Sequence, residues 1–257
     1  EVPEALRRSD GSSVYTIAGS ARFTSPQLLA AEARIVARAG QYDGRSVPAG
    51  AVDLAMLAST ANGLPLNAGQ ATLVREMATS GARLQLAIAP AGAGKTTAMA
   101  ALAHAWTEGG GTVIGLAPSA AAADVLGENI NATTDTMAKL TWHLDHPALG
   151  ELPEWAAAIG PTSMVVIDEA GMADTLSLDK VVDFVIARGG SVRLIGDDQQ
   201  LSSVGAGGVL RDIQATHGSL HLTELMRFTN PAEGAASLAL REGLTEALGF
   251  YLERDRI

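Results

Sequence analysis

Residues 89–97 read Ala-Pro-Ala-Gly-Ala-Gly-Lys-Thr-Thr, a glycine-rich turn with a lysine and two threonines at its end. The apolar run 84–88 precedes it, and the segment 96–106 after it has helix-forming composition without glycine or proline. A strand, a turn and a helix in this order let successive backbone N–H groups converge on an anion, provided that small residues allow its approach. Gly92 and Gly94 meet that requirement. The stretch therefore predicts a phosphate-binding loop.

Two side chains at the end of the loop suit a nucleotide with a bound metal. Lys95 would reach the outer phosphates, and the Thr96 hydroxyl would ligate a magnesium ion held between them. Ala89 stands where the pattern G-x-x-x-x-G-K-[ST] usually has its first glycine. An ordinary glycine-rich turn with a solvated lysine is the alternative, but the carboxylates described below favour a nucleotide. We therefore expect ATP and Mg²⁺ as cofactors.

The composition favours a globular enzyme. The 257 residues, 47% of them hydrophobic, suffice for one large domain or one and a half. Apolar runs are too short for a membrane span, nothing resembles a signal peptide, and cysteine is absent, which excludes disulfides and thiolate zinc sites. We therefore expect a cytoplasmic location and no membrane partner. The first residue, Glu1, suggests a fragment of a longer polypeptide.

The net charge of −10 argues against a dedicated high-affinity DNA module, because phosphate backbones are bound mainly through Lys and Arg. The chain has 18 Lys and Arg residues, and only Lys95, Lys139 and Lys180 are lysines. A DNA groove here would therefore use guanidinium groups, backbone amides and hydroxyls. The acidity remains compatible with a motor domain that contacts the strand lightly, or with an ATP-dependent switch that acts on protein partners.

Three parts follow one another along the chain. Residues 1–64 form a mainly helical lead-in, in which Ser25 and Pro26 begin a helix that Gly40 ends, 51–58 form a second helix and 14–17 resemble a strand. Over 65–223, strands alternate with helices, which predicts an α/β fold with a mostly parallel sheet flanked by helices. Residues 224–257 would begin a second, truncated domain. The expected strands are 84–89, 112–117, 164–167, 192–195 and 220–223.

Two adjacent carboxylates, Asp168 and Glu169, follow the apolar strand 164–167. Carboxylates at the end of a buried strand are costly unless they face a cation. In this interpretation Asp168 holds the magnesium ion, and Glu169 orients and deprotonates the water that attacks the terminal phosphate. A solvated strand end with capping acids is the alternative. We expect Lys95 and this pair to follow neighbouring strands and to meet at their carboxyl ends, where ligands of parallel sheets bind.

Three further side chains are candidates for the same site. The amide of Gln200, after the strand 192–195, could sense the terminal phosphate, although an exposed turn glutamine is the alternative. Arg227 could stabilise charge on the transferred phosphoryl group, or form a surface ion pair with Glu224. Gln70 has the amide needed to bind the adenine edge and also stands three residues after Asn67, where a helix-capping box predicts it. Both roles of Gln70 are compatible.

These blocks, in this order, resemble the first motor domain of superfamily 1 DNA helicases of the RecD-like branch, a RecA-like P-loop NTPase fold. Within that branch, residues 23–33 of the lead-in and the sequence Asp-Glu-Ala-Gly-Met at 168–172 resemble the helicase segment of TraA/TraI-type conjugative relaxases. The motifs that carry the resemblance are Gln70, residues 89–97, 117–120, 168–172, 196–201 and 222–227. The helicase resemblance covers most of residues 66–228.

The resemblance implies an ATP-driven motor that moves 5′ to 3′ on single-stranded DNA. It assigns catalysis to Lys95, Glu169, Gln200 and Arg227, the metal to Thr96 and Asp168, and DNA contacts to Pro118, Ser119 and Thr136. The nucleotide would be bound by Gln70, Ala91, Gly92, Ala93, Gly94, Lys95, Thr96 and Thr97. Trp142 or Trp155 could stack on bases, although burial in the core is the favoured interpretation.

The later helicase motifs and a His-rich nicking site have no candidates in the chain. The implied partners are therefore single-stranded DNA, a second motor lobe and a relaxase nicking domain, and the chain alone should hydrolyse ATP poorly. A stand-alone RecD-like repair helicase and a non-translocating single-strand DNA-binding module are the alternatives to a relaxase motor.

Overall fold

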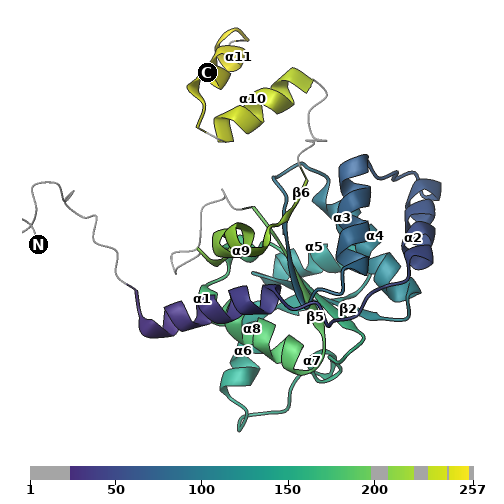
Figure 1. Cartoon of the computed structure of the whole chain (residues 1–257), viewed down its shortest axis with the longest axis vertical. Helices are drawn as coiled ribbons and strands as arrows, with labels where there is room; N and C mark the ends of the chain where they lie inside the picture. The colour runs from purple at the N-terminus through teal and green to yellow at the C-terminus, as the bar shows by residue number, and fades with distance from the viewer. Residues whose placement is uncertain (1–23, 198–207, 223–230, 242, 255–257) are drawn as a thin grey trace, which may run out of the picture.

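Six parallel strands form one sheet in the computed structural model, which describes residues 24–197, 208–222, 231–241 and 243–254 (Figure 1). The order across the sheet is β3-β2-β4-β5-β1-β6, and every pair of neighbours is parallel. The strands are β1 (Leu84–Ile88), β2 (Thr112–Ala117), β3 (Thr133–Thr136), β4 (Ser163–Ile167), β5 (Ser191–Gly196) and β6 (Leu220–His221). The predicted α/β fold with a parallel sheet is confirmed.

Helices cover both faces of the sheet and enclose two cores. One core joins the sheet to α2 (Ala49–Ala61), α3 (Ala68–Thr79), α4 (Lys95–Glu108) and α5 (Ala120–Ile130). The other joins it to α1 (Pro26–Ala39), α6 (Met137–Asp145), α7 (Glu154–Ala157), α8 (Thr175–Ala187) and α9 (Val209–His217). The central strands are apolar on both faces, as a sheet covered on both sides requires.

The two helices of the predicted lead-in pack on opposite layers. Helix α1 begins where expected, with the Ser25 hydroxyl accepting from the Leu28 N–H, and ends at Gly40. It contacts α8 and α9, whereas α2 contacts α4 and α3. Helix α2 runs from 49 to 61, longer than the expected 51–58. The domain boundaries near residues 64 and 223 stay predictions, and the strand expected at 14–17 lies outside the described residues.

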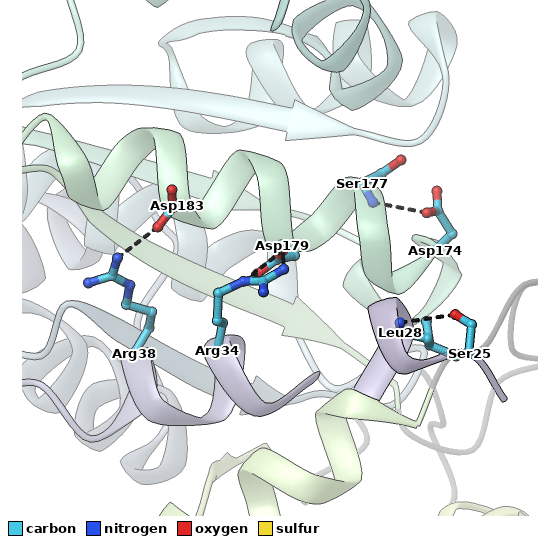
Figure 2. Close-up of polar contacts among 8 residues, drawn as sticks. All are labelled: Ser25, Leu28, Arg34, Arg38, Asp174, Ser177, Asp179 and Asp183. Atoms are coloured by element: carbon cyan, nitrogen blue, oxygen red, sulfur yellow. Dashed lines mark hydrogen bonds and ion pairs between the residues drawn. The ribbon is translucent and has the colours of Figure 1, made fainter. Parts of the chain in front are cut away.

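Ion pairs fix α1 on α8 (Figure 2). The Arg34 guanidinium donates to both carboxylate oxygens of Asp179, and Arg38 donates to Asp183 at 2.7 Å. Both pairs join residues 145 positions apart in the chain. Because Arg34 is half exposed, these ion pairs contribute little, and the buried Ile35 and Ala39 supply most of the attachment.

Edge strand β3 was not predicted. Its sequence, Thr-Thr-Asp-Thr, contains no apolar residue, and its side chains are partly or fully exposed. An edge strand pairs on one side only and needs no continuous apolar run, so the hydrophobic pattern could not identify it. The predicted strands 84–89, 112–117, 164–167 and 192–195 are confirmed within a residue, and of 220–223 the described part shows Leu220–His221 as strand.

A fully buried arginine on β5 ties α3 to the sheet. The Arg193 guanidinium donates to the carbonyl oxygens of Met77 at 2.8 and 3.0 Å and of Ala82 at 2.9 Å, and lies over the Trp106 ring. Burial lowers the pKa of Arg193 to about 9, which leaves it charged at neutral pH. A cation beside the last carbonyls of α3 also offsets the negative end of its dipole.

The C-terminal part consists of α10 (Pro231–Arg241), the 3₁₀ turn η3 (Thr245–Ala247) and α11 (Leu248–Leu252), which contact one another. In the part of the chain that the structure describes, no helix is both long and apolar enough to cross a membrane.

Candidate nucleotide site

The N-terminus of α4 is open toward solvent at the carboxyl edge of the sheet. Gly92 and Gly94 both have a left-handed backbone, with φ of 86° and 72°. Gly94 occupies the N-cap position, and no side chain caps the helix. The first N–H groups of an α-helix have no partner within the helix, and the helix dipole favours an anion beside them. This geometry fits the predicted phosphate-binding loop.

Alanine fits at position 89, where the pattern usually has glycine. The Ala89 N–H continues the pairing of β1 with β5 by donating to the Gly196 carbonyl at 2.9 Å. Among the described residues other than glycine, only Asn131 and Glu169 have a positive φ, so Ala89 has an ordinary backbone. A methyl group is therefore tolerated there, and the departure from the pattern leaves the loop intact.

Lys95 lies between the two predicted carboxylates. Its Nζ is 2.8 Å from Asp168 Oδ1 and 2.7 Å from Glu169 Oε1. Burial lowers the pKa of Lys95, but the charges of and hydrogen bonds to Asp168 and Glu169 outweigh burial and raise it above its usual value. The lysine thus carries the positive charge that the two carboxylates face. The predicted meeting of Lys95 with this pair is observed.

Strand β5 lies between the strands that carry these groups. The sequence interpretation placed Lys95 and Asp168 after neighbouring strands, whereas β1 and β4 each pair with β5. This detail of the interpretation is wrong, because strand neighbours cannot be inferred from chain order in a sheet with crossovers. Lys95 reaches the carboxylates because its long side chain spans the end of β5.

The backbone around Glu169 is strained. Glu169 has φ 51° and ψ 39°, a left-handed conformation that typically costs a residue with a side chain about 1–2 kcal/mol. The Asp168 carboxylate accepts from the Glu169 N–H at 2.8 Å, and the Asp168 N–H donates to the Leu116 carbonyl at 2.9 Å. Such strain concentrates at functional sites. Here it directs two consecutive carboxylates toward the same lysine.

Gln70 holds the phosphate loop from α3. Its Nε2 donates to the Gly94 carbonyl at 2.9 Å, and its Oε1 accepts from the Asn67 N–H at 2.9 Å. The Asn67 side chain in turn accepts from the Gln70 N–H, which completes the predicted capping box. The side chain is 2% exposed. The capping role is confirmed, and adenine recognition by Gln70 stays a prediction.

The residues of the loop fit a nucleoside triphosphate with bound magnesium. Among the described residues, no side chain caps the α4 N-terminus. Ala91 and Thr96 are exposed to solvent, Gly92, Lys95 and Thr97 are partly exposed, and Ala93 is buried. A hydroxyl on the first helical turn and a carboxylate are oxygen ligands of the kind that Mg²⁺ prefers. Thr96 and Asp168 supply them.

The three predicted DNA contacts lie at the same edge of the sheet, after β2 and β3. Pro118 and Ser119 are exposed. Ser119 caps α5 by accepting from the Ala122 N–H at 3.2 Å, and Thr136 caps α6 by accepting from the Lys139 N–H at 3.2 Å. Their hydroxyls therefore have a local structural role, and DNA contact stays a prediction.

Two of the three tryptophans are accessible. Trp142 on α6 is 47% exposed and stacks on His146, whereas Trp155 is partly buried and its indole N–H donates to Asp135 at 3.2 Å. Burial of both tryptophans was the favoured interpretation, and for Trp142 it is wrong. Gln200 and Arg227 lie outside the described residues, so their placement is not tested.

The parallel sheet and the phosphate loop define a P-loop NTPase domain of the RecA-like α/β type. A family model described as an AAA domain matches residues 65–257. Because this match covers most of the chain, the chain belongs to that AAA domain family.

The relatives found by sequence are conjugal transfer proteins. The chain is 28% identical over 240 residues to conjugal transfer protein TraA of Agrobacterium fabrum, covering 92% of this chain and 21% of that protein. It is 31% identical over 179 residues to TraA of Rhizobium radiobacter, covering 68% and 15%. A probable TraA of Sinorhizobium fredii is 28% identical over 229 residues, covering 88% and 20%. The resemblance to TraA-type proteins is confirmed, and the chain spans about a fifth of their length.

A solved structure is also similar, the complex of Arterivirus nonstructural protein 10 (helicase) with DNA. The TM-score is 0.40 at 16% identity, and the match covers 61% of this chain and 40% of that one.

Proposed function

We propose that this chain is the ATP-binding and ATP-hydrolysing first motor domain of a DNA helicase within a conjugative relaxase, moving 5′ to 3′ on single-stranded DNA. The observation that carries the proposal is the open N-terminus of α4 with Lys95 held within 2.8 Å of both Asp168 and Glu169. A structural ion pair would not require a loop of left-handed glycines at a helix start.

Each residue of the site has a defined task in this proposal. The N–H groups of the loop and Lys95 bind the phosphates, and Thr96 and Asp168 hold Mg²⁺. Bound Mg²⁺ neutralises phosphate charge and fixes the geometry of the terminal phosphate. Glu169 accepts a proton from the attacking water, whose oxygen forms the new bond to phosphorus while the bridging oxygen of the β-phosphate departs.

The ion pairs of Lys95 make the site responsive to the nucleotide. Lys95 must turn from the carboxylates to reach the phosphates, and this exchange frees Glu169 to bind water. The two carboxylates raise the pKa of Lys95, so the lysine is protonated at neutral pH before the exchange, and the negative charge of the phosphates would favour the same protonated form afterwards. Nucleotide binding would thus make Glu169 available as the catalytic base.

The DNA substrate and the relaxase setting rest on sequence relationship. The relatives named TraA are conjugal transfer proteins, which favours a relaxase motor over a repair helicase. The N-termini of α5 and α6 lie at the sheet edge that also holds the site, where phosphates of a strand are favoured by the helix dipoles. The direction of movement comes from the family resemblance.

The test is the ATPase rate of the longer parent protein with and without single-stranded DNA. We expect strong stimulation by DNA, loss of nucleotide binding in Lys95→Ala, and intact binding without turnover in Glu169→Gln. Lys139→Ala is the matched control, since Lys139 also lies in the first turn of a helix at this edge and pairs with Asp135. Normal hydrolysis by Glu169→Gln would contradict the assignment of the base.

Direction is tested separately on partial duplexes with a 5′ or a 3′ single-stranded tail. Unwinding only from the 5′ tail is expected for the parent protein. The 257-residue chain by itself should bind ATP and turn it over slowly, and a fast DNA-stimulated rate from it would contradict that expectation.

A further inference from the structure

A cavity of about 200 Å³ is lined in part by the two carboxylates Asp168 and Glu169. Its lining comes from three connections at the carboxyl edge: Pro118 after β2, residues of α6 after β3, and residues 168–177 after β4. No residue of the phosphate loop lines it. The cavity therefore shares the two carboxylates with the proposed ATPase site but not the loop proposed for the phosphates.

The cavity has both apolar and polar walls. Pro118, Met137, Ala138, Met172 and Ala173 form the apolar part, and Thr141 and Ser177 add hydroxyls. Met172 is 48% exposed, so its thioether is accessible from solvent. Apolar surface beside a few polar groups is typical of sites that bind small organic groups. The volume is smaller than the 300–1,000 Å³ or so of drug-sized sites and suits one planar ring system.

The charges around the cavity select against an anion. Asp168, Glu169 and Asp174 contribute to the lining, and the described lining contains no Lys or Arg. Asp174 caps α8 by accepting from the Ser177 N–H at 2.9 Å (Figure 2). Lys95 offsets one of these three negative charges, and a phosphate inside would still be repelled. A neutral base that carries an N–H donor, such as the ring N–H of thymine, would be accepted, since carboxylates accept hydrogen bonds.

We propose that this cavity receives one unstacked base of the single-stranded DNA. The inference rests on the proposed function, because it requires that the strand runs along this edge. Ser119 directly follows Pro118 after β2, and Thr136 ends β3 two residues before Ala138. A DNA backbone at the N-termini of α5 and α6 would therefore lie next to a base in the cavity. Base stacking on apolar and aromatic surfaces supplies sequence-tolerant affinity for single strands.

The position of the cavity gives the base a direct connection to the ATPase site. Met172 and Ala173 follow the strained Glu169 along the η2 turn (Ala170–Met172), and the Met172 N–H donates to the Glu169 carbonyl at 2.8 Å. A base against Met172 therefore contacts the segment that sets the orientation of Glu169. Occupation of the cavity is expected to affect hydrolysis as well as DNA affinity.

The test fills the cavity with a phenyl ring. Ala138 is exposed and is the second residue of α6, and Ala138→Phe places a ring where the base would bind. Ala121→Phe is the matched control: Ala121 is exposed, is the second residue of α5 and lies outside the lining. Affinity is measured by fluorescence anisotropy on the 257-residue chain with two oligonucleotides of equal length, one of thymidines and one abasic.

We expect the wild-type chain and Ala121→Phe to bind the thymidine strand about tenfold more tightly than the abasic strand. Ala138→Phe should bind the abasic strand as before and lose that preference. Met172→Ala, which deletes a wall without filling the cavity, should reduce the preference severalfold. A strand that contains 4-thiothymine should crosslink to residues 168–177 of the wild-type chain. The Ala138→Phe variant, whose cavity is filled by the phenyl ring, should give no such crosslink.

Three results would overturn the inference. Equal binding of both strands by the wild-type chain would show that no base is recognised. An unchanged preference in Ala138→Phe would show that the base is recognised elsewhere. Neither result would contradict the proposed motor function. Absence of binding to either strand by the chain and by its parent protein would refute the proposed DNA function and the cavity inference together.

Discussion

Four helices follow β1, β2, β3 and β4 at the same edge of the sheet, and one of them differs from the other three. Helices α5, α6 and α8 each begin with a side-chain cap, provided by Ser119, Thr136 and Asp174. Helix α4 begins at Gly94 without such a cap. Because a side-chain oxygen at the N-cap satisfies some of the donors that an anion would otherwise bind, α4 is, of these four, the helix start best suited to bind a nucleotide phosphate directly. The starts of α5 and α6 favour a DNA phosphate mainly through their helix dipoles.

The most direct way to remove the difference is to place a carboxylate at the start of α4. Gly94→Asp should lower the affinity for MgATP at least about 100-fold, since a charge within about 4 Å of a phosphate is strongly repelled in a partly buried site. Folding stability should fall by about 1 kcal/mol at most, because Asp tolerates a left-handed backbone and suits a helix N-terminus.

Calorimetric titration and thermal unfolding measure the two effects together. Gly94→Asn is the control of matched size without the charge and should retain more of the affinity than Gly94→Asp. Equal losses in both variants would show that bulk, and not charge, decides the affinity.

Removing the contact that holds the open loop should have the next largest effect. Gln70→Leu deletes the hydrogen bond to the Gly94 carbonyl and the one from the Asn67 N–H, which should cost about 1–3 kcal/mol of stability. The affinity for MgATP should fall about tenfold, because the loop loses its hold on α3. Gln70→Glu keeps an oxygen for the Asn67 N–H but loses the bond to Gly94 and adds a negative charge beside the loop, so the same titration should show a larger loss of affinity than in Gln70→Leu.

Removing the side-chain caps of α5 and α6 should lower the free energy of unfolding without changing the affinity for MgATP. Ser119→Ala and Thr136→Ala should each cost about 1 kcal/mol in chemical denaturation and leave the affinity for MgATP unchanged. Ser119→Asp preserves a cap and adds a negative charge, so it should weaken DNA binding without loss of stability. A loss of MgATP affinity in the alanine variants would remove the distinction between the open and the capped helix starts.

The smallest effect concerns acid stability next to the α6 cap. Burial raises the pKa of Asp135, but hydrogen bonds from the Lys139 side chain, the Thr136 N–H and Trp155 lower it overall. A carboxyl whose pKa is lowered on folding stabilises the protein above its unfolded value near 4, and this contribution is lost as the pH falls below it. Asp135→Asn should therefore lower the free energy of unfolding at pH 7 by less than about 1 kcal/mol, and the difference in thermal unfolding between variant and wild type should shrink as the pH falls below 4.

The sequence predicted those parts of the fold and site that depend on local pattern. Apolar runs located the buried strands, and the order of glycines, Lys95 and the Asp168–Glu169 pair located the loop and its carboxylates. Edge strand β3 was missed because its residues are polar, and the position of β5 between β1 and β4 was missed because chain order does not determine strand order. Arg193 could not be recognised either, since its partners are backbone carbonyls that leave no pattern in the sequence.

The measurement that tests the central claim most directly is a calorimetric titration of MgATP into the 257-residue chain, with Lys95→Ala alongside. The account predicts saturable binding with one site per chain, dependent on Mg²⁺ and lost in Lys95→Ala. Absence of binding, or equal binding by the variant, would contradict the assignment of the open α4 terminus and Lys95 to nucleotide phosphates.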